Sequence, residues 1–129
     1  MKAIAVVNRT RGTTLGTRIA LADRWWLRLR GQIARPEPRP GEGLMLTRCR
    51  AVHMYGVRYP LDIAFVDRRG AVVALHEGLR PNTRTGWYRR AAHAIELPAG
   101  TLAATHTREG DLLEWGPPGA TPDRHDRGP

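Results

Sequence analysis

Residues Leu61–His76 read L-D-I-A-F-V-D-R-R-G-A-V-V-A-L-H, a pattern that predicts a β-hairpin. Leu61–Val66 and Ala71–His76 are short runs rich in aliphatic, β-branched and aromatic side chains, which is typical of strands. The Asp67–Gly70 segment between them is polar and ends in glycine, as a tight turn does. Two strands joined by so short a turn run antiparallel, so this stretch favours an antiparallel β fold.

Further strand-like segments lie on both sides of this hairpin. Ala3–Val7 and Leu15–Ala22 flank a polar turn and predict a second hairpin near the start of the chain. Downstream, glycine, proline and polar residues interrupt the apolar runs at intervals that fit short strands. Leu44–Met54 is expected to form a strand pair or one long bent strand, and single strands are expected at Ala91–Leu97 and Asp111–Trp115.

One segment has the period of a helix instead. Asp23 is a suitable N-cap for Arg24–Ile33, in which Trp26, Leu29 and Ile33 share one face. The proline-rich stretch that follows cannot continue the helix. Taken together, these patterns predict an α+β fold, namely a small, mainly antiparallel β barrel or sandwich with one packed helix.

The length of 129 residues fits a single domain with one core. This globular domain is expected to span residues 1–115. From Gly116 the chain reads G-P-P-G-A-T-P-D-R-H-D-R-G-P, which has no apolar periodicity. Residues 116–129 are therefore predicted to form a disordered tail.

Composition bears on the compartment. The apolar run Ala3–Val7 is too short for a secretory signal or a membrane span. Cys49 is the only cysteine and cannot form an internal disulfide, which fits a reducing compartment. We expect a soluble cytoplasmic protein that does not associate with a membrane.

The net charge of +9 raises the question of a nucleic-acid partner. Almost all of the positive charge is arginine, scattered along the chain with no basic run longer than two residues. No helix-turn-helix, zinc-finger or RNP motif accompanies it. A solvated basic surface is the preferred interpretation, and nucleic-acid binding through scattered arginines stays as a weaker alternative.

Cys49 and His53 are the first candidates for chemistry, as a nucleophile and its base. On a strand, a separation of four residues places their Cα atoms about 13 Å apart, which is too far for a thiolate–imidazole pair. A direct dyad therefore requires a bulge or a bend between them. Without one, Cys49 is a small buried side chain and His53 a hydrogen-bonded histidine.

Asp62 and Glu96 are carboxylates set among apolar strand residues. Alternation predicts that both face away from the core, where they would converge as an acid–base pair in a cleft. The alternative is a set of ion pairs with arginine, for which Arg48, Arg50 and Arg58 are available.

Aromatic residues supply a further candidate. Trp26 is expected in the core, and the adjacent Trp25 is expected to be partly exposed. Trp87 and Tyr88 close the polar loop Gly78–Trp87 and are placed to stack on a ligand or to anchor the loop. The histidines and the single cysteine lack the spacing of a metal site, and no cofactor motif is present. We therefore expect no metal and no cofactor.

Several short motifs stand out along the chain, namely His53-Met54, Pro60–Ile63 with Phe65, Glu96–Gly100 and Gly110-Asp111. Together these motifs resemble the domain of unknown function family number 192, over roughly Leu15 to Trp115. The chain is most similar to the branch whose members carry Cys and His in the central motif, as Cys49 and His53 do here. The resemblance implies a compact, mainly antiparallel β domain with a packed helix. It implies no reaction, because none is established for the family.

The sequence thus favours an uncharacterised small β-rich protein that acts as a ligand-binding or interaction module, whose ligand or protein partner is unknown. Its expected groove is lined by His53, Asp62, Glu96 and Trp87. The enzyme alternative is a hydrolase or transferase that uses Cys49 with His53, or Asp62 with Glu96. No catalytic residue is assigned. The candidate site residues are Cys49, His53, Asp62, Glu96 and Trp87.

Overall fold

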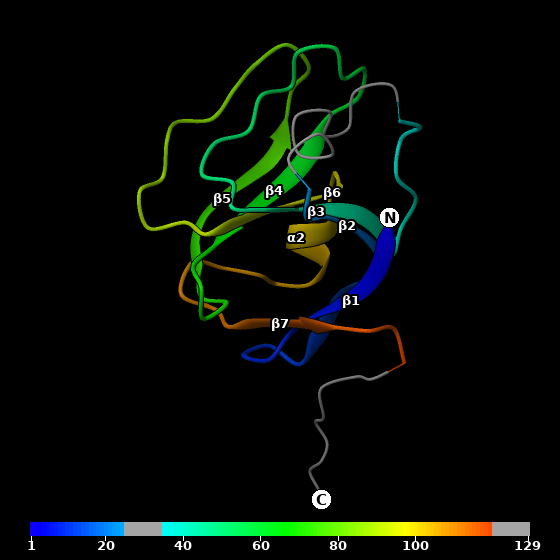
Figure 1. Cartoon of the computed structure of the whole chain (residues 1–129), viewed down its shortest axis with the longest axis vertical. Coiled ribbons are helices and arrows are strands. Elements are labelled where there is room, and N and C mark those ends of the chain that lie inside the picture. Colours follow the sequence, from blue (N-terminus) through cyan, green and yellow to red (C-terminus); the bar gives the residue numbers. More distant parts are fainter. Residues whose placement is uncertain (25–34, 120–129) are drawn as a thin grey trace, which may run out of the picture.

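The computed structural model describes residues 1–24 and 35–119. Within these ranges, seven strands form one curled sheet in the order β5-β4-β6-β3-β2-β1-β7 (Figure 1). A short helix, α2 (Thr101–Ala104), follows β6 and lies within the curve of the sheet (Figure 1). The strands are β1 (Lys2–Asn8), β2 (Thr13–Ala22), β3 (Glu42–Thr47), β4 (Leu61–Val66), β5 (Val72–Leu79), β6 (His93–Pro98) and β7 (Leu113–Gly116).

Neighbouring strands pair antiparallel throughout the sheet except for β2 and β3, which are parallel. Over the described residues the fold is a mostly β half-barrel with the short helix α2, in a single domain, so the prediction of a small, mainly antiparallel β domain is confirmed. The helix predicted at Arg24–Ile33, with Trp25 and Trp26, falls in residues 25–34 and lies outside the described residues. Within the described ranges, no helix has the length and apolar character needed to cross a membrane.

Some predicted strands differ from the observed ones. Leu44–Met54 is not a long bent strand, because β3 ends at Thr47 and Arg48 adopts a left-handed backbone with φ of 54°. That conformation interrupts an extended ladder. β7 begins at Leu113, two residues later than expected, and α2 was not predicted. The predicted tail is described as far as Gly119, and residues 120–129 lie outside the described residues.

Both faces of β4 are buried, which is why its six residues are all inaccessible to solvent. On the concave face, Ala64 and Val66 pack with side chains of β6 and with Leu102 of α2. On the convex face, Leu61, Ile63 and Phe65 pack beneath apolar residues of the loops that follow β3 and β5. The loops after β3 and β5 therefore form a second layer over the sheet.

The half-barrel closes at one end through the β4–β5 turn. Val72 N–H donates to the Asp111 carbonyl at 2.8 Å, and Leu113 N–H donates to the Gly70 carbonyl at 2.9 Å. Gly70 has a φ of 93°, and a Cβ atom at this position would lie 2.2 Å from the Leu113 carbonyl oxygen. Only glycine permits so close a contact between the turn and the chain before β7.

Asp62 joins three elements on the concave face. Its fully buried carboxylate accepts hydrogen bonds from the backbone N–H groups of Gly78 at 2.8 Å, Gly100 at 3.1 Å and Leu102 at 2.9 Å. Gly100 is the N-cap residue of α2 and offers no side-chain cap of its own. Asp62 therefore supplies the capping acceptor that α2 lacks and also fixes the end of β5.

We expect Asp62→Asn to lower the free energy of unfolding by about 2 kcal/mol or more, because an amide cannot accept from all three buried N–H donors. Urea denaturation followed by circular dichroism measures this difference. Glu77→Gln, on an exposed carboxylate of β5, is the matched control and should change stability by less than about 0.5 kcal/mol. Equal small losses in the two variants would contradict the proposed joining role.

Candidate functional site

The candidate site lies in the layer formed by residues 48–60 and 80–92. These segments leave the sheet side by side because β3 and β6 are paired up to the contact of Thr47 with His93. Beyond that pair the ladder becomes irregular but continues. Its hydrogen bonds run from Cys49 N to Ala92 O at 3.0 Å, from Tyr88 N to Arg50 O at 2.9 Å, from Thr85 N to Val52 O at 2.8 Å and from Met54 N to Thr83 O at 2.7 Å.

Tyr88 anchors the second of these segments and thereby orients Trp87. Its ring packs on Phe65 with a centroid distance of 4.7 Å, and its hydroxyl forms a 2.7 Å hydrogen bond with Nε2 of His76. With Tyr88 directed into the core, the preceding Trp87 projects outward and is 69% exposed. The sequence left open whether this pair anchors the loop or contacts a ligand, and the structure gives the anchoring role to Tyr88.

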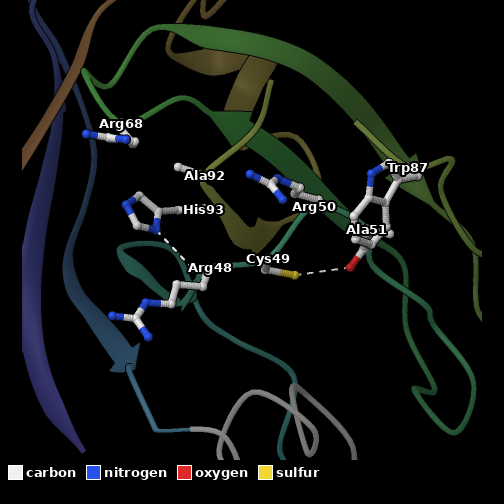
Figure 2. A pocket seen from close by; sticks show the side chains of 8 residues that line it. All are labelled: Arg48, Cys49, Arg50, Ala51, Arg68, Trp87, Ala92 and His93. Carbon is white, nitrogen blue, oxygen red and sulfur yellow. Dashed lines mark hydrogen bonds between the residues drawn. The ribbon is translucent and has the colours of Figure 1, made fainter. Parts of the chain in front are cut away.

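The larger described pocket in this layer, here called the arginine pocket, has a volume of about 740 Å³. That volume is within the range of small-molecule sites. Figure 2 shows Arg48, His93 and Arg68 projecting to the same side, with Arg50 and Cys49 between them and Trp87. The lining residues are Arg48, Cys49, Arg50, Ala51, Arg68, Trp87, Ala92 and His93.

The arginine pocket is strongly positive. Arg48, Arg50 and Arg68 are exposed, and none of the eight lining residues is acidic. Among residues 1–24 and 35–119, the ion pairs are Arg9 with Glu114, Arg11 with Asp111 and Arg18 with Glu42, so no carboxylate neutralises the three lining arginines. Three guanidinium groups are thus available to an anion from solution.

One hydrogen bond decides which ring nitrogen of His93 carries the proton when the ring is neutral. The backbone N–H of Arg48 donates to Nδ1 of His93 at 3.2 Å, so the proton of the neutral ring is on Nε2. Burial lowers the pKa of His93, and the positive charge of Arg48 lowers it further. The ring also packs edge-on against Trp115 with a centroid distance of 5.7 Å. At neutral pH, His93 therefore presents an Nε2–H hydrogen-bond donor rather than a second charge.

Arg50 and Cys49 also make local contacts within the pocket. Nε of Arg50 donates to the Ala91 carbonyl at 2.9 Å, which ties the two segments together and leaves the terminal nitrogens of the guanidinium exposed. Sγ of Cys49 donates to the Ala51 carbonyl at 3.1 Å, and the side chain is half-buried (Figure 2). Arg50 thus has a structural contact in addition to its charge, whereas the guanidinium groups of Arg48 and Arg68 form no ion pair within the described part of the chain.

A second pocket, here called the histidine pocket, has a volume of about 470 Å³ and includes His53 and Arg84 in its lining. Nδ1 of His53 accepts from the Tyr55 N–H at 3.3 Å, and the two rings stack with a centroid distance of 5.3 Å. Cys49 lines the arginine pocket and His53 the histidine pocket, and no hydrogen bond joins these two described residues. A direct Cys49–His53 dyad stays a prediction.

The predicted convergence of Asp62 with Glu96 is wrong. In the β4–β6 register Ile63 lies opposite Glu96, and Asp62 lies opposite Leu97. Residues opposite one another point to the same face, so the two carboxylates point to opposite faces of the sheet. Neither lines the arginine or the histidine pocket, so the expected four-residue groove does not form, and neither carboxylate has an ion pair with Arg48, Arg50 or Arg58.

Glu96 is the most perturbed carboxyl among the described residues. It is 3% exposed, and its Oε1 atom is buried without a hydrogen-bond partner. Burial raises the pKa of Glu96 to about 8, although the positive charge of Arg35 opposes the shift. The pKa of Tyr59 is also raised, first by burial and then by the charge of Glu96. Glu96 is therefore protonated at neutral pH.

Sequence reasoning missed the basic character of this layer. It treated Arg48 and Arg50 as partners for carboxylates, His93 as an isolated residue, and did not single out Arg68. The signal was present, since residues 48–60 and 80–93 contain no Asp or Glu, but it has meaning only when the two segments are known to be adjacent. Their exposed arginines are Arg48, Arg50, Arg58, Arg80, Arg84, Arg89 and Arg90.

Comparison with known proteins places the chain in a family. The family model DUF192, described as Uncharacterized ACR, COG1430, matches residues 6–115. The chain belongs to the DUF192 family. A UPF0127 protein of Thermococcus sibiricus is 28% identical over 114 residues, which cover 85% of this chain and 73% of the relative. A UPF0127 protein of Thermococcus kodakarensis is 27% identical over 116 residues, which cover 87% of this chain and 73% of that relative.

Two solved structures share the fold of this DUF192 protein. A protein of unknown function from Novosphingobium aromaticivorans superimposes with a TM-score of 0.74 at 23% identity, covering 88% of this chain and 84% of that one. A protein from Sinorhizobium meliloti 1021, proposed to be a transcription regulator, gives a TM-score of 0.72 at 24% identity, with coverages of 89% and 96%. At these identities the similarity concerns the fold alone. In the described part of the chain, no three His, Cys, Asp or Glu side chains are grouped so that they could hold a metal ion.

The raised pKa of Glu96 predicts how the stability of the DUF192 domain depends on pH. Below pH 4.5 the carboxyl is protonated in the folded and unfolded chain, so it has little influence on stability. Between pH 4.5 and about 8 the unfolded chain releases this proton while the folded chain keeps it, so stability falls as the pH rises. Above pH 8 the loss is complete.

Glu96→Gln removes this titration, so its stability relative to the natural chain should increase by about 1 kcal/mol per pH unit across that window. Urea denaturation at a series of pH values measures the difference. Glu77→Gln serves as the control and should follow the natural chain at every pH. A difference between Glu96→Gln and the natural chain that is independent of pH would rule out a proton held by Glu96.

Proposed function

We propose that this DUF192 protein is a binding module whose ligand carries an anionic group that binds in the arginine pocket. The observation that carries this proposal is that Arg48, Arg50 and Arg68 line one pocket without a carboxylate partner. Ion pairs within a protein ordinarily accompany such a grouping, and here the described residues supply none. An anion from solution is the complementary partner.

The chemistry of the lining supports an oxyanion such as a phosphate or a carboxylate. Guanidinium groups donate two parallel hydrogen bonds to such oxygens, which gives both charge and orientation. The Nε2–H of His93 adds a neutral donor on the side to which Arg48 and Arg68 project (Figure 2). Trp87 contributes an apolar wall, which suits a ligand with a flat organic part.

Three of the predicted site residues keep a place in this proposal. Cys49 and Trp87 line the arginine pocket, and His53 lines the adjacent histidine pocket. Asp62 and Glu96 do not take part. We favour a binding module over a hydrolase or transferase because Cys49 and His53 line different pockets, and because the register of β4 with β6 turns Asp62 and Glu96 to opposite faces of the sheet.

We also infer that the chain belongs to the branch of the family that carries Cys and His in the central motif. Cys49 and His53 support this placement, since both are part of the layer that forms the two pockets. The single cysteine supports a reducing, cytoplasmic compartment, because the chain cannot form an internal disulfide.

Titration of the full chain with phenyl phosphate tests the proposed function. Amide NMR shifts should change at Arg48–Ala51 and at the Trp87 indole, whereas the uncharged benzyl alcohol should produce no comparable change. Arg48→Gln and Arg68→Gln should each lower the affinity for phenyl phosphate about tenfold, because each removes a charged hydrogen-bond donor. Arg50 is left intact because its contact with Ala91 also holds the loops.

The matched control is Arg69→Gln, which removes an exposed arginine adjacent to Arg68 that does not line the pocket. It should bind phenyl phosphate as the natural chain does. The proposal fails if Arg69→Gln weakens binding as much as Arg68→Gln does, or if phenyl phosphate and benzyl alcohol bind equally well.

A further inference from the structure

The loop layer is a basic surface much larger than the arginine pocket. Residues 48–60 and 80–93 hold seven of the 21 basic residues and none of the 12 acidic ones, so they account for most of the net charge of +9. All seven arginines are exposed. Backbone hydrogen bonds hold the two segments side by side, so charges that are far apart in the sequence lie in one layer of the fold.

The two pockets of this surface share a wall. Ala51 and Trp87 line both the arginine pocket and the histidine pocket. Because Trp87 is 69% exposed, a ligand that leaves one pocket and enters the other must pass its indole ring. Arg84 is in the lining of the second pocket, so guanidinium groups occur on both sides of the ring. An extended ligand with repeated negative charges would match guanidinium groups placed in both pockets.

Exposed aromatic rings accompany the arginines. Tyr55 is 49% exposed and stacks on His53 at the histidine pocket, and Trp87 stands at the junction of the two pockets. An exposed indole flanked by guanidinium groups is the arrangement that binds bases and phosphates along a single strand, with the ring stacked on a base and the arginines on the backbone. Each nucleotide of such a strand supplies one anion and one flat ring.

We propose that the ligand is a single-stranded nucleic acid that crosses from the arginine pocket to the histidine pocket and stacks a base on Trp87. This inference rests on the proposed function and names the ligand class for the same site. A duplex is less suitable, because its bases are paired within the helix and cannot stack on an exposed indole. An acidic peptide matches the charge, but its residues carry no flat ring that could stack on Trp87.

Fluorescence anisotropy with a labelled thymidine oligonucleotide of about 12 nucleotides tests the inference on the full chain. We expect this probe to bind at about 50 mM salt and its affinity to fall steeply by about 200 mM salt, because binding to phosphates releases counterions from the strand. A duplex of the same length and a polyglutamate peptide of similar charge should each bind at least about tenfold more weakly.

Variants locate the bound strand. Trp87→Leu should lower the affinity for the oligonucleotide about tenfold. Trp87→Phe should lower it less, because a phenyl ring can still stack on a base. Arg84→Gln should reduce the slope of log affinity against log salt concentration by about 1, because it removes one phosphate contact. Arg108→Gln, an exposed arginine outside both pockets, is the control and should bind the oligonucleotide as the natural chain does.

The outcomes separate this inference from the proposed function. If phenyl phosphate binds and the oligonucleotide does not, the nucleic-acid inference is overturned while the anion-binding function stands. If neither binds, both fail. Equal affinity for polyglutamate would instead identify an acidic peptide as the ligand, and equal affinity for the duplex, or an unchanged affinity in Trp87→Leu, would exclude a strand stacked on Trp87.

Discussion

The antiparallel pairing of β3 with β6 is the interaction on which the loop layer depends. Its register brings Thr47 opposite His93, so the chain leaves the sheet on neighbouring strands and the following segments start side by side. The left-handed residue Arg48 then interrupts the regular ladder, and hydrogen bonds such as that of Cys49 with Ala92 continue it in irregular form. A regular ladder would have extended the sheet, whereas this interruption produces two loops that fold over β4 and enclose the pockets.

The buried carboxyls Asp62 and Glu96 show how register decides the role of a side chain. Asp62 and Glu96 occur in similar apolar surroundings in the sequence and differ by one position in the pairing of β4 with β6. Asp62 faces the concave side, where its carboxyl group accepts hydrogen bonds from the backbone N–H groups of Gly78, Gly100 and Leu102. Glu96 faces the other side, where Oε1 has no donor and the carboxyl holds its proton instead.

This difference also explains how much could be predicted. Local patterns identified the β4–β5 hairpin, the β1–β2 hairpin and the strand around Ile95, because side-chain alternation and turn composition act over a few residues. Register is a property of two strands at once, and a shift of one residue reverses every side chain, so alternation within each strand could not decide whether Asp62 meets Glu96. The basic layer was missed for a related reason, since the arginines are scattered until the pairing of β3 with β6 makes two distant segments adjacent.

The basic layer also places a demand on the fold. Seven exposed arginines without an acidic neighbour in either segment repel one another, and this repulsion is weakened only by salt or by a bound anion. The fold resists it with contacts beneath the loops, where Tyr88 packs on Phe65 and Val52 is hydrogen-bonded to Thr85. Because these anchors belong to the core, the backbone that carries the arginines is held in place without a ligand, which would lower the cost of ordering these loops on binding. An anion bound as we propose would relieve the repulsion and stabilise the folded state by mass action, so the affinity of the pocket and the stability of the domain would be linked through the same arginines.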